Sequence, residues 1–400
     1  MNTTAELGIV SGDRRSAADD YAIGSFPRPT GEIRDRVDTF ISELRADKPY
    51  FLGFPANLDF SFSGLSGLLD IFVNNVGDPR STEKAAISAK PMECAVVDAI
   101  TELANGRPEH TYGYVGASGS EANLFGLDRG CTLLPDAKIY CSAATHYSVR
   151  KAARLMRKEL VVLDCDESGR MDVDALADAC RRDAGRGAVV VATLGTTMTG
   201  AIDDVDAIVD AAASAGRVYV HLDAALGGLI VPFTEHGTTW GFAKAEVGSL
   251  AISMHKGLGM PVPCALALCR AELVRTAVEG EYVGATDATL GCSRAGMASV
   301  LLWYALSDKG IAGLEQHARR ALTTAEYAVT TLAASGLNPM RHRESIIVVF
   351  DRPAEWICRK YYLATEGERA HIVTLPHVRE SMIDSLCLDI LEPGAAVTRG

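Results

Sequence analysis

The stretch from Ala188 to Asp223, AVVVATLGTTMTGAIDDVDAIVDAAASAGRVYVHLD, is the most informative guide to the fold class of this chain. It begins with an apolar, β-branched run at 188–194 and ends with a second apolar run at 218–222. Between them, DDVDAIVDAAASAG from Asp203 carries apolar residues at helical spacing and begins with an aspartate that suits a helix N-cap. Strand, helix and strand in this order predict two parallel strands joined by a helix.

The same alternation continues on both sides of this stretch. DVDALADACRRD from Asp172 predicts another helix. Further strands are predicted at Lys138–Ser142, Leu160–Leu163, Ser249–Ser253 and Cys264–Leu268. The pattern therefore predicts an α/β fold with a mainly parallel sheet and helices on both faces, in which ligands bind beyond the carboxyl ends of the strands.

Three regions are expected along the chain. Residues 1–50 form an N-terminal segment, expected to be partly disordered because its first part is polar and has no sustained period. Residues 51–290 hold the alternating pattern and form the large domain. Residues 291–400, where a long helical pattern leads to SIIVVF from Ser345, form a smaller C-terminal domain of helices and strands.

Composition limits the classes of function. The 400 residues are 48% hydrophobic, enough for a large core, and the formal net charge of −12 disfavours nucleic acid as a partner. No export signal and no apolar run of membrane-spanning length is visible, so the protein is expected in the cytoplasm. Ten cysteines without a C-x-x-C pair indicate reduced, mostly buried thiols, and no metal site is expected.

A first candidate site segment is GYVGASGSEANLFGL, from Gly113 to Leu127. Its small residues lead into a helix that is expected to begin near Ser120. The backbone N–H groups and the positive end of the dipole at such a helix start can cradle a phosphate. Gly/Ser turns before helices are common, however, and an ordinary capping turn explains the pattern equally well.

A second segment, HLDAALGGLIVP, places Asp223 after the apolar strand VYVHL. A carboxylate there needs a cationic or hydrogen-bonding partner, and a protonated pyridine nitrogen is a suitable one. A helix N-cap or a structural ion pair would also explain this aspartate.

A third segment, SMHKGLGMPVPC, places Lys256 after a strand and before two glycines. A lysine in a site of low dielectric has a lowered pKa and can attack an aldehyde. The alternative is an ordinary lysine whose ammonium group reaches the solvent.

A fourth segment, YCSAATHYSVRKAARL, places His146 in a turn after a strand. An imidazole in that position could stack on an aromatic ring. A solvated loop histidine is the simpler alternative.

The order of the four segments, which is phosphate cradle, histidine, aspartate and lysine, is the order found in fold-type I pyridoxal phosphate enzymes. The chain resembles the group II pyridoxal phosphate amino-acid decarboxylases, and most closely their short bacterial histidine decarboxylase branch. The resemblance covers nearly the whole length, including FLGFPANLDFSFSGL, FVNNVGDP, THYSV, GTTMTGAIDD, HLDAALGG, PVPC, LGCSRAG, LLWYAL, SIIVVF and LATEGERAH.

This resemblance implies a fold-type I architecture with a seven-stranded sheet and a smaller C-terminal α+β domain. It also implies pyridoxal 5'-phosphate as the cofactor and a homodimer with active sites at the interface. Lys256 would form the Schiff base, Asp223 would pair with the pyridine nitrogen, and the ring would lie between Ala225 and His146. The implied phosphate ligands, and the residue at the cofactor's edge, are Gly119, Ser120, Ser253, His255 and Thr197.

The implied reaction is decarboxylation of an L-amino acid to its amine and carbon dioxide, with histidine as the leading substrate. Tyr282 and His146 are candidates for the group that protonates the α-carbon. The chain departs from close relatives at Ala117, where they have asparagine, and at Gly284 and Ala285, where they have larger or polar residues. Aspartate, an aromatic amino acid or a non-standard amino acid therefore stay open as substrates.

Two alternatives stay open as well. One is a different pyridoxal phosphate reaction, such as transamination, a lyase step or a cyclisation in specialised metabolism. A transaminase usually clamps the substrate carboxylate with arginines, and Arg341 and Arg343 are possible residues for this task. The other is a non-catalytic subunit with the same fold, against which the set Lys256, Asp223 and His146 argues.

Overall fold

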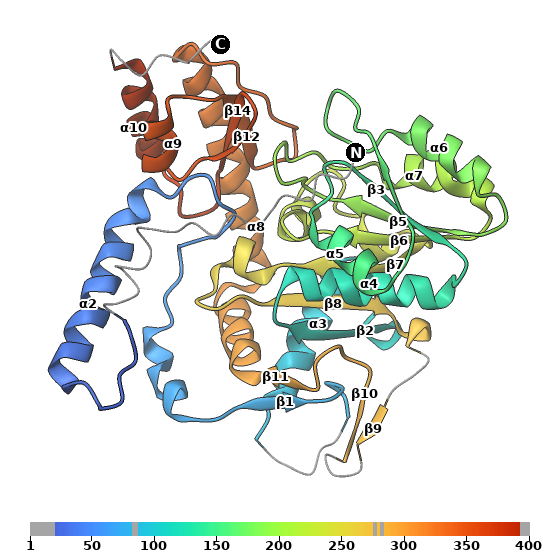
Figure 1. Ribbon diagram of the computed structural model, residues 1–400, viewed down its shortest axis with the longest axis horizontal. Helices are drawn as coiled ribbons and strands as arrows, with labels where there is room; N and C mark the ends of the chain where they lie inside the picture. Colours follow the sequence, from blue (N-terminus) through green and yellow to red (C-terminus); the bar gives the residue numbers. More distant parts are fainter. Residues whose placement is uncertain (1–20, 82–86, 275–277, 281–283, 393–400) are drawn as a thin grey trace. The chain divides into compact units, whose positions relative to one another are not determined.

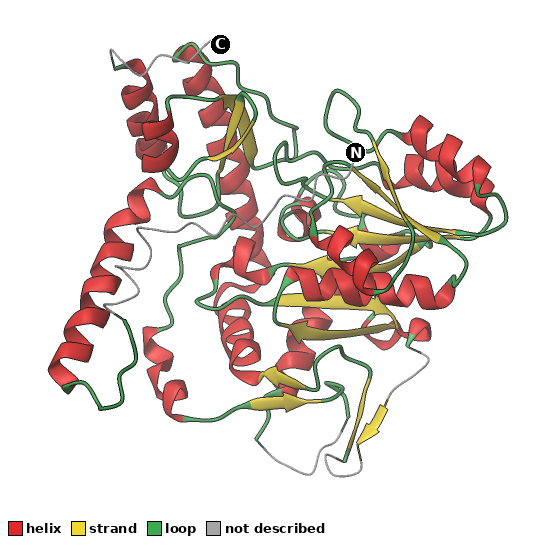
Figure 2. Cartoon of the chain, in the orientation of Figure 1, coloured by secondary structure: helices red, strands yellow, loops and turns green. Residues whose placement is uncertain are grey.

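The computed structural model describes residues 21–81, 87–274, 278–280 and 284–392, and residues 1–20, whose mobility was expected, lie outside this part (Figures 1 and 2). The chain divides into two compact units, Met1–Pro49 and Tyr50–Gly400. In the first unit, α2 (Thr30–Asp47) leaves apolar side chains such as Val37 and Phe40 exposed. Among the described residues, no helix combines the length and apolar character that a membrane crossing requires.

A seven-stranded sheet forms the centre of the second unit, in the order β2-β8-β7-β6-β5-β3-β4. The strands are β2 (Thr111–Gly116), β3 (Lys138–Ser142), β4 (Leu160–Leu163), β5 (Ala188–Thr193), β6 (Val218–Asp223), β7 (Val247–Ile252) and β8 (Ala265–Arg270). Neighbours from β4 to β7 pair in parallel, whereas β8 runs antiparallel to both β7 and β2. The mainly parallel sheet predicted from the sequence is confirmed.

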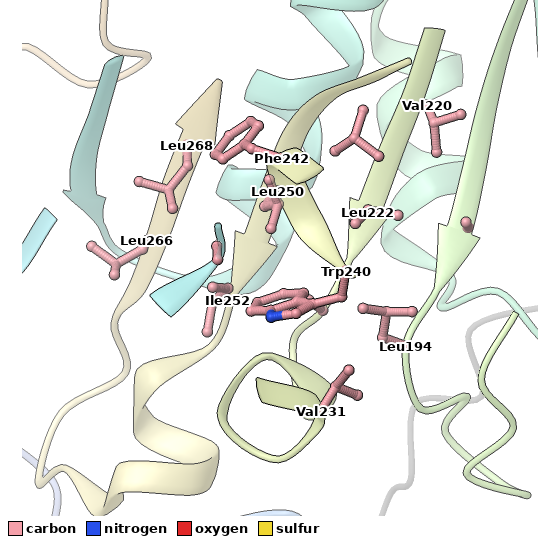
Figure 3. Close-up of a cluster of buried hydrophobic side chains, with 14 of the residues drawn as sticks. Leu194, Val220, Leu222, Val231, Trp240, Phe242, Leu250, Ile252, Leu266 and Leu268 are labelled. Carbon is pink, nitrogen blue, oxygen red and sulfur yellow. The ribbon is translucent and has the colours of Figure 1, made fainter. Parts of the chain in front are cut away.

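Helices cover both faces of this sheet (Figure 1). On one face lie α4 (Gly119–Leu133) and α5 (Ser148–Leu155); on the other lie α3 (Lys90–Leu103), α6 (Val173–Arg182), α7 (Val205–Ala212) and the first part of α8 (Gly296–Ala334). Successive residues of a strand point to opposite faces, so Val190 belongs to one core and Val191 to the other. Figure 3 shows part of the larger core, where Trp240 and Phe242 pack with apolar strand residues.

Aspartates begin the helices that cross over between strands. The carboxylate of Asp172 accepts a hydrogen bond from the Ala175 N–H and caps α6, and Asp204 caps α7. Asp203, next to that cap, is buried instead, and its two oxygens accept hydrogen bonds from the N–H groups of Met171 and Thr193, each at 2.8 Å. Burial raises the pKa of Asp203 to about 6.

The C-terminal part contains the smaller α+β region that the sequence predicts. Its antiparallel sheet has the order β12-β14-β13, built from Ile347–Asp351, Arg369–Val373 and Ala364–Glu366 respectively. The second part of α8, together with α9 (Glu355–Lys360) and α10 (Glu380–Leu391), packs against it in a separate core. The predicted helix is continuous in α8 except at Gly310, where φ is 62°. The boundary at residue 290 stays a prediction.

Two short antiparallel pairs complete the described strands: β1 (Asn74–Val76) with β11 (Ser293–Ala295), and β9 (Val278–Gly280) with β10 (Ala285–Asp287). Near β1, a buried ion pair joins Arg294 to Glu93. Asn75 is fully buried beside it, with its Nδ2 2.6 Å from Glu93 Oε2 and 3.2 Å from Ser299 Oγ, and its Oδ1 2.7 Å from the Ala89 N–H. All ten cysteines are free thiols and seven of them are buried, as the composition predicted.

Candidate active site

The carboxyl ends of β2, β3, β5, β6 and β7 meet at one cavity of about 200 Å³. The antiparallel β8 begins at the same edge, because its direction is reversed. The cavity is lined by Ser118, Gly119, Ser120, Asn123, His146, Thr193, Gly195, Thr197, Asp223, Ala225, Ser253, His255, Lys256 and Pro263.

Nine of the ten residues that the sequence and the family resemblance singled out line this cavity. They are Gly119, Ser120, His146, Thr197, Asp223, Ala225, Ser253, His255 and Lys256. The tenth, Tyr282, lies outside the described residues. Residues separated by more than a hundred positions are thus brought together at the edge where a parallel sheet binds its ligands.

Lys256 lies in a short π-helical turn, His255–Gly259, directly after β7. Its backbone oxygen accepts a hydrogen bond from the Asn57 N–H at 2.9 Å. Its Nζ has no hydrogen bond or ion pair with any residue in the described part of the chain. Burial lowers the pKa of Lys256, and the negative charge of Asp223 acts in the opposite direction. The amine is therefore closer to its unprotonated, nucleophilic form than a surface lysine.

Asp223 is the last residue of β6, and only 3% of it is exposed. Its Oδ2 accepts a hydrogen bond from Asn123 Nδ2 at 2.9 Å, and its Oδ1 accepts one from the Ala225 N–H at 3.2 Å. It forms no ion pair with any described cationic side chain, and it is not the N-cap of a described helix. The described residues therefore support neither alternative explanation of this aspartate, and its carboxylate can accept a cationic group bound in the cavity.

His146 follows β3, in a turn. Its Nδ1 lies 2.8 Å from Ser148 Oγ and 3.3 Å from the Ser148 backbone nitrogen. Burial lowers the pKa of His146, and the positive charges of Lys256 and Lys151 add to this effect while Asp223 opposes it. The imidazole is therefore held neutral at the cavity wall rather than solvated as an ordinary loop histidine.

The start of α4 lines one part of the cavity. Ser118 is the N-cap, and its Oγ accepts a hydrogen bond from the Glu121 N–H at 3.3 Å. The first N–H groups of a helix have no acceptor within the helix, so those of Gly119 and Ser120 are available to an anion. A Cβ at Gly119 would lie 2.5 Å from Ser253 Oγ, so glycine keeps the space between helix start and strand end open.

Sequence reasoning missed Asn123, Thr193, Gly195 and Pro263, which also line the cavity. The Oγ1 of Thr193 is buried and has no hydrogen-bond partner among the described residues. A buried hydroxyl without a partner is costly, and one in a cavity wall marks a place for a polar atom of a bound molecule. Two of these residues carried a weak signal in the sequence. Thr193 is the first polar residue after AVVVA, and Asn123 lies one helical turn beyond Gly119.

The hydrogen-bonding and charged groups that line the cavity suit pyridoxal phosphate. A helix start with a glycine and nearby serine hydroxyls suits the phosphate, and a carboxylate suits the protonated ring nitrogen. A buried amine with a lowered pKa suits the aldehyde, and the unpartnered hydroxyl of Thr193 offers a further polar contact.

Arg341 and Arg343, the candidate carboxylate clamp of a transaminase, are engaged elsewhere. The Arg341 guanidinium donates to the backbone oxygens of Arg343 at 2.7 Å and of Ser345 at 2.9 Å. Arg343 pairs with Glu235 at 2.8 Å. Neither arginine lines the cavity, so the observed contacts do not support the clamp.

One group of described side chains has the residue types of a metal site. Glu235, His236 and Glu344 bring their potential ligand atoms within 4.8 Å of one another. Arg343 already pairs with Glu235, and His236 lies 3.8 Å from Glu344. These contacts account for the proximity of the three side chains without a metal ion.

Known proteins resemble this chain in sequence and in fold. The pyridoxal-dependent decarboxylase conserved domain matches residues 129–351. Histidine decarboxylase from Acinetobacter baumannii is 34% identical over 364 residues, which cover 90% of this chain and 95% of that one. Serine decarboxylase 2 from Oryza sativa subsp. japonica is 35% identical over 346 residues, covering 85% and 73%. The solved structure of L-methionine decarboxylase from Streptomyces sp.590 has a TM-score of 0.84 at 21% identity, covering 94% and 98%.

Proposed function

This chain belongs to the pyridoxal-dependent decarboxylase family, and from that membership we propose the roles of its site residues and its substrate. It is a pyridoxal 5'-phosphate-dependent carboxy-lyase that decarboxylates an amino acid. The cofactor supplies the electron sink for the bond that breaks at the α-carbon. The protein supplies binding, orientation and proton transfer.

Lys256 is the residue that binds the cofactor covalently. The observation that carries this proposal is the arrangement of its amine, which is buried, has a lowered pKa and lines the same cavity as Asp223. Asp223 would hold the proton on the pyridine nitrogen, because hydrogen bonds from Asn123 Nδ2 and the Ala225 N–H fix its carboxylate in the cavity wall.

The remaining residues orient the cofactor. Ala225 would contact one face of the ring, His146 would stack on the other, and Thr197 would lie at its edge. The ligands of the phosphate are Gly119, Ser120, Ser253 and His255. A contact of 2.8 Å between His255 Nδ1 and the Cys264 backbone oxygen supports this role for His255, because it leaves Nε2 for the ligand.

A proton must reach the α-carbon after carbon dioxide has left. Among the described residues, His146 is the candidate donor, since it lines the cavity. Its Nδ1 faces Ser148, so a proton on the neutral ring is carried by Nε2. Tyr282 stays the second candidate.

Histidine is the proposed substrate, because the relative from Acinetobacter baumannii is a histidine decarboxylase that aligns over 95% of its length. Serine is the second candidate, because the rice relative, at 35% identity, is a serine decarboxylase. The two side chains differ in size and in charge, so a single experiment can distinguish them.

The test is to offer each common amino acid to purified, cofactor-loaded protein and to measure amine and carbon dioxide by mass spectrometry. The expected result is histamine from histidine. Ethanolamine from serine would instead show that serine is the substrate. A product that keeps its carboxylate and needs a second substrate would replace decarboxylation by transamination. If none of the amino acids yields an amine and carbon dioxide, a lyase or cyclisation step in specialised metabolism would be favoured.

We further propose that the protein is a cytoplasmic homodimer with its active sites near the interface. Several large apolar side chains are exposed in the second unit: Leu69, Ile71, Phe72, Trp303 and Tyr304, with Leu69 and Phe72 at 77% and 72% exposure. Apolar surface of this kind is typical of an interface between subunits. Analytical ultracentrifugation and cell fractionation test the two statements, and a monomer at micromolar concentration would contradict the first.

A further inference from the structure

Asn123 is a buried asparagine, 2% exposed, whose side chain contacts three residues around the cavity. Its Nδ2 lies 2.9 Å from Asp223 Oδ2 and 2.9 Å from Ser148 Oγ, and its Oδ1 lies 3.0 Å from His221 Nε2. Every hydrogen-bonding position of the amide nitrogen is thus used, and the amide oxygen has a partner as well.

The chemistry of these partners determines which way the amide points. An ionised carboxylate only accepts hydrogen bonds, so the nitrogen of Asn123 must face Asp223. Its oxygen then faces His221, and His221 Nε2 must carry a proton in order to donate to it. The orientation of the amide and the tautomer of His221 therefore follow from the charge on Asp223.

His221 extends the chain of hydrogen bonds into the protein. It is fully buried, and burial lowers its pKa to about 4, so the ring is neutral near pH 7. With the proton on Nε2, its Nδ1 accepts a hydrogen bond from the Ser249 hydroxyl at 2.7 Å. The Tyr219 hydroxyl lies 2.6 Å from Ser249 Oγ and 2.8 Å from the backbone oxygen of Gly126, and can donate to either.

The sequence provides the space for this chain of hydrogen bonds. A Cβ at Gly126 would lie 2.3 Å from His221 Nδ1 and 2.7 Å from Ser249 Oγ. Glycine at this position lets α4 approach β6 and β7 closely enough for Asn123 to reach both His221 and Asp223. No larger residue could stand there without displacing the imidazole.

The second hydrogen atom of the Asn123 amide acts on the other side of the cavity. Because Ser148 Oγ accepts from Asn123, its own hydroxyl proton can be donated to His146 Nδ1 at 2.8 Å. The Ser148 N–H points to the same ring nitrogen at 3.3 Å. One amide therefore orients both the carboxylate of Asp223 and the imidazole of His146.

We propose that Asn123 is a positioning residue which, held by His221, Ser249 and Tyr219, keeps the Asp223 carboxylate aimed at the cofactor ring nitrogen and keeps the His146 ring in place. This inference rests on the proposed function, since it takes the ring nitrogen as the partner of Asp223. Loss of the amide removes one of the two hydrogen bonds that hold the Asp223 carboxylate in position, so the carboxylate would be less well oriented toward the ring nitrogen and would hold the proton there less well.

The test compares Asn123→Leu with Asn75→Leu, its matched control. Asn75 is an equally buried asparagine with three hydrogen-bond partners, but it lies outside the cavity. Each protein is loaded with cofactor labelled with ¹⁵N in the ring, and the ring nitrogen shift and the dissociation constant of the cofactor are measured. Both variants should unfold at lower temperature than the wild type.

Only Asn123→Leu should move the ring nitrogen signal toward its unprotonated position and weaken cofactor binding about tenfold, the size expected for one lost hydrogen bond to a charged group. Wild-type values for both measurements in Asn123→Leu would overturn the inference. An equal change in Asn75→Leu would overturn it too, because a general loss of packing would then explain the result.

A second pair of variants decides the matter if Asn123→Leu does not fold. His221→Leu removes the donor that holds the Asn123 oxygen, whereas His221→Gln can replace it with an amide N–H. The ring nitrogen signal should move in the leucine variant and return in the glutamine variant, and identical signals in the two would overturn the inference. If the wild-type protein itself does not bind pyridoxal phosphate at Lys256, the proposed function fails first, which is a distinguishable result.

Discussion

Thr193 and Asp223 lie directly opposite each other at the carboxyl ends of the paired strands β5 and β6. The carboxylate of Asp223 has its hydrogen-bond donors, whereas the Thr193 hydroxyl, in the same cavity wall, has no partner among the described residues. We infer from this contrast that the Thr193 hydroxyl is available to a bound molecule.

We therefore predict that Thr193→Val weakens the binding of cofactor or substrate by about threefold to tenfold. The unfolding free energy of the cofactor-free protein should stay constant or rise, because a buried hydroxyl without a partner is lost. Thr196→Val is the control, since the Thr196 hydroxyl bonds to Thr199 Oγ1 and the Ala201 N–H, and its loss should lower stability. Calorimetry and cofactor titration measure both quantities, and unchanged binding in Thr193→Val would contradict the assignment.

Lys256→Ala should abolish turnover, because the amine that binds the cofactor covalently is lost, and should leave the fold intact. Borohydride reduction followed by peptide mass spectrometry should find the reduced cofactor on Lys256 of the wild type and nowhere in the variant. Lys244→Ala, which removes a surface partner of Asp206, is the control and should still be labelled at Lys256. Turnover that survives in Lys256→Ala, or a wild type that cannot be labelled, would contradict an enzyme of this kind.

Gly119→Ala should weaken cofactor binding by about tenfold or more while leaving the stability of the cofactor-free protein nearly unchanged. The new methyl group would lie 2.5 Å from Ser253 Oγ, which can rotate away but then no longer faces the phosphate. Gly64→Ala is the matched control, because a Cβ there meets no atom within 4 Å. The affinity of each variant for pyridoxal phosphate is measured by titration followed by absorbance. Equal affinities in the two variants would contradict a phosphate site next to Gly119.

His221 should make stability depend on pH. Its pKa in the folded protein, about 4, is below its ordinary value of 6.5, so below pH 6.5 the unfolded chain binds a proton that the folded chain does not. The contribution of His221 is thus complete above pH 6.5 and is lost as the pH falls toward 4, by about 3 kcal/mol in total.

The measurement is the difference in unfolding free energy between the wild type and His221→Gln at pH 7 and at pH 4. Asp203, whose raised pKa of about 6 acts in the opposite direction over the same range, is present in both proteins and cancels in the difference. The unfolding free energy of the wild type should exceed that of His221→Gln by less at pH 4 than at pH 7. A constant difference would show that His221 is not held neutral.

His371→Phe should lower the unfolding free energy by about 1–3 kcal/mol. His371 lies in β14, and its two ring nitrogens are each 3.1 Å from a backbone oxygen, one of Met198 and one of Gly53. The imidazole thereby connects the C-terminal sheet to the loop that carries Thr197. His342→Phe is the control, because His342 contacts the Ser168 backbone oxygen at an exposed position and its loss should have little effect.

The large sheet could be predicted from the sequence because most of its strands are buried on both faces and are therefore largely apolar. The runs at Lys138–Ser142 and Leu160–Leu163 coincide with β3 and β4. The reversal of β8 could not be predicted in this way, since an apolar run looks the same in either direction. The helix α2 was missed as well, because its apolar residues are exposed and its sequence is polar on average.

The candidate site was predictable where a short motif combines a reactive residue with a strand end, as at Lys256 and Asp223. Asn123 and His221 could not be found in this way. Asn123 lies within a helix, where a polar residue is usually solvent-exposed, and His221 lies in the middle of an apolar strand. Their importance depends on the contact between α4 and β6, which only the folded chain establishes.

The distribution of thiols gives a route to observing this protein in solution. Burial raises the pKa of Cys264 and of Cys269 to about 12, so neither forms the reactive thiolate near pH 7. Cys292 is exposed and follows the segment that contains Tyr282, and its backbone oxygen is bound by the Gly77 N–H at 3.0 Å. A maleimide dye should therefore react at Cys292 before the buried thiols, and would label the protein at one known position without any engineered cysteine.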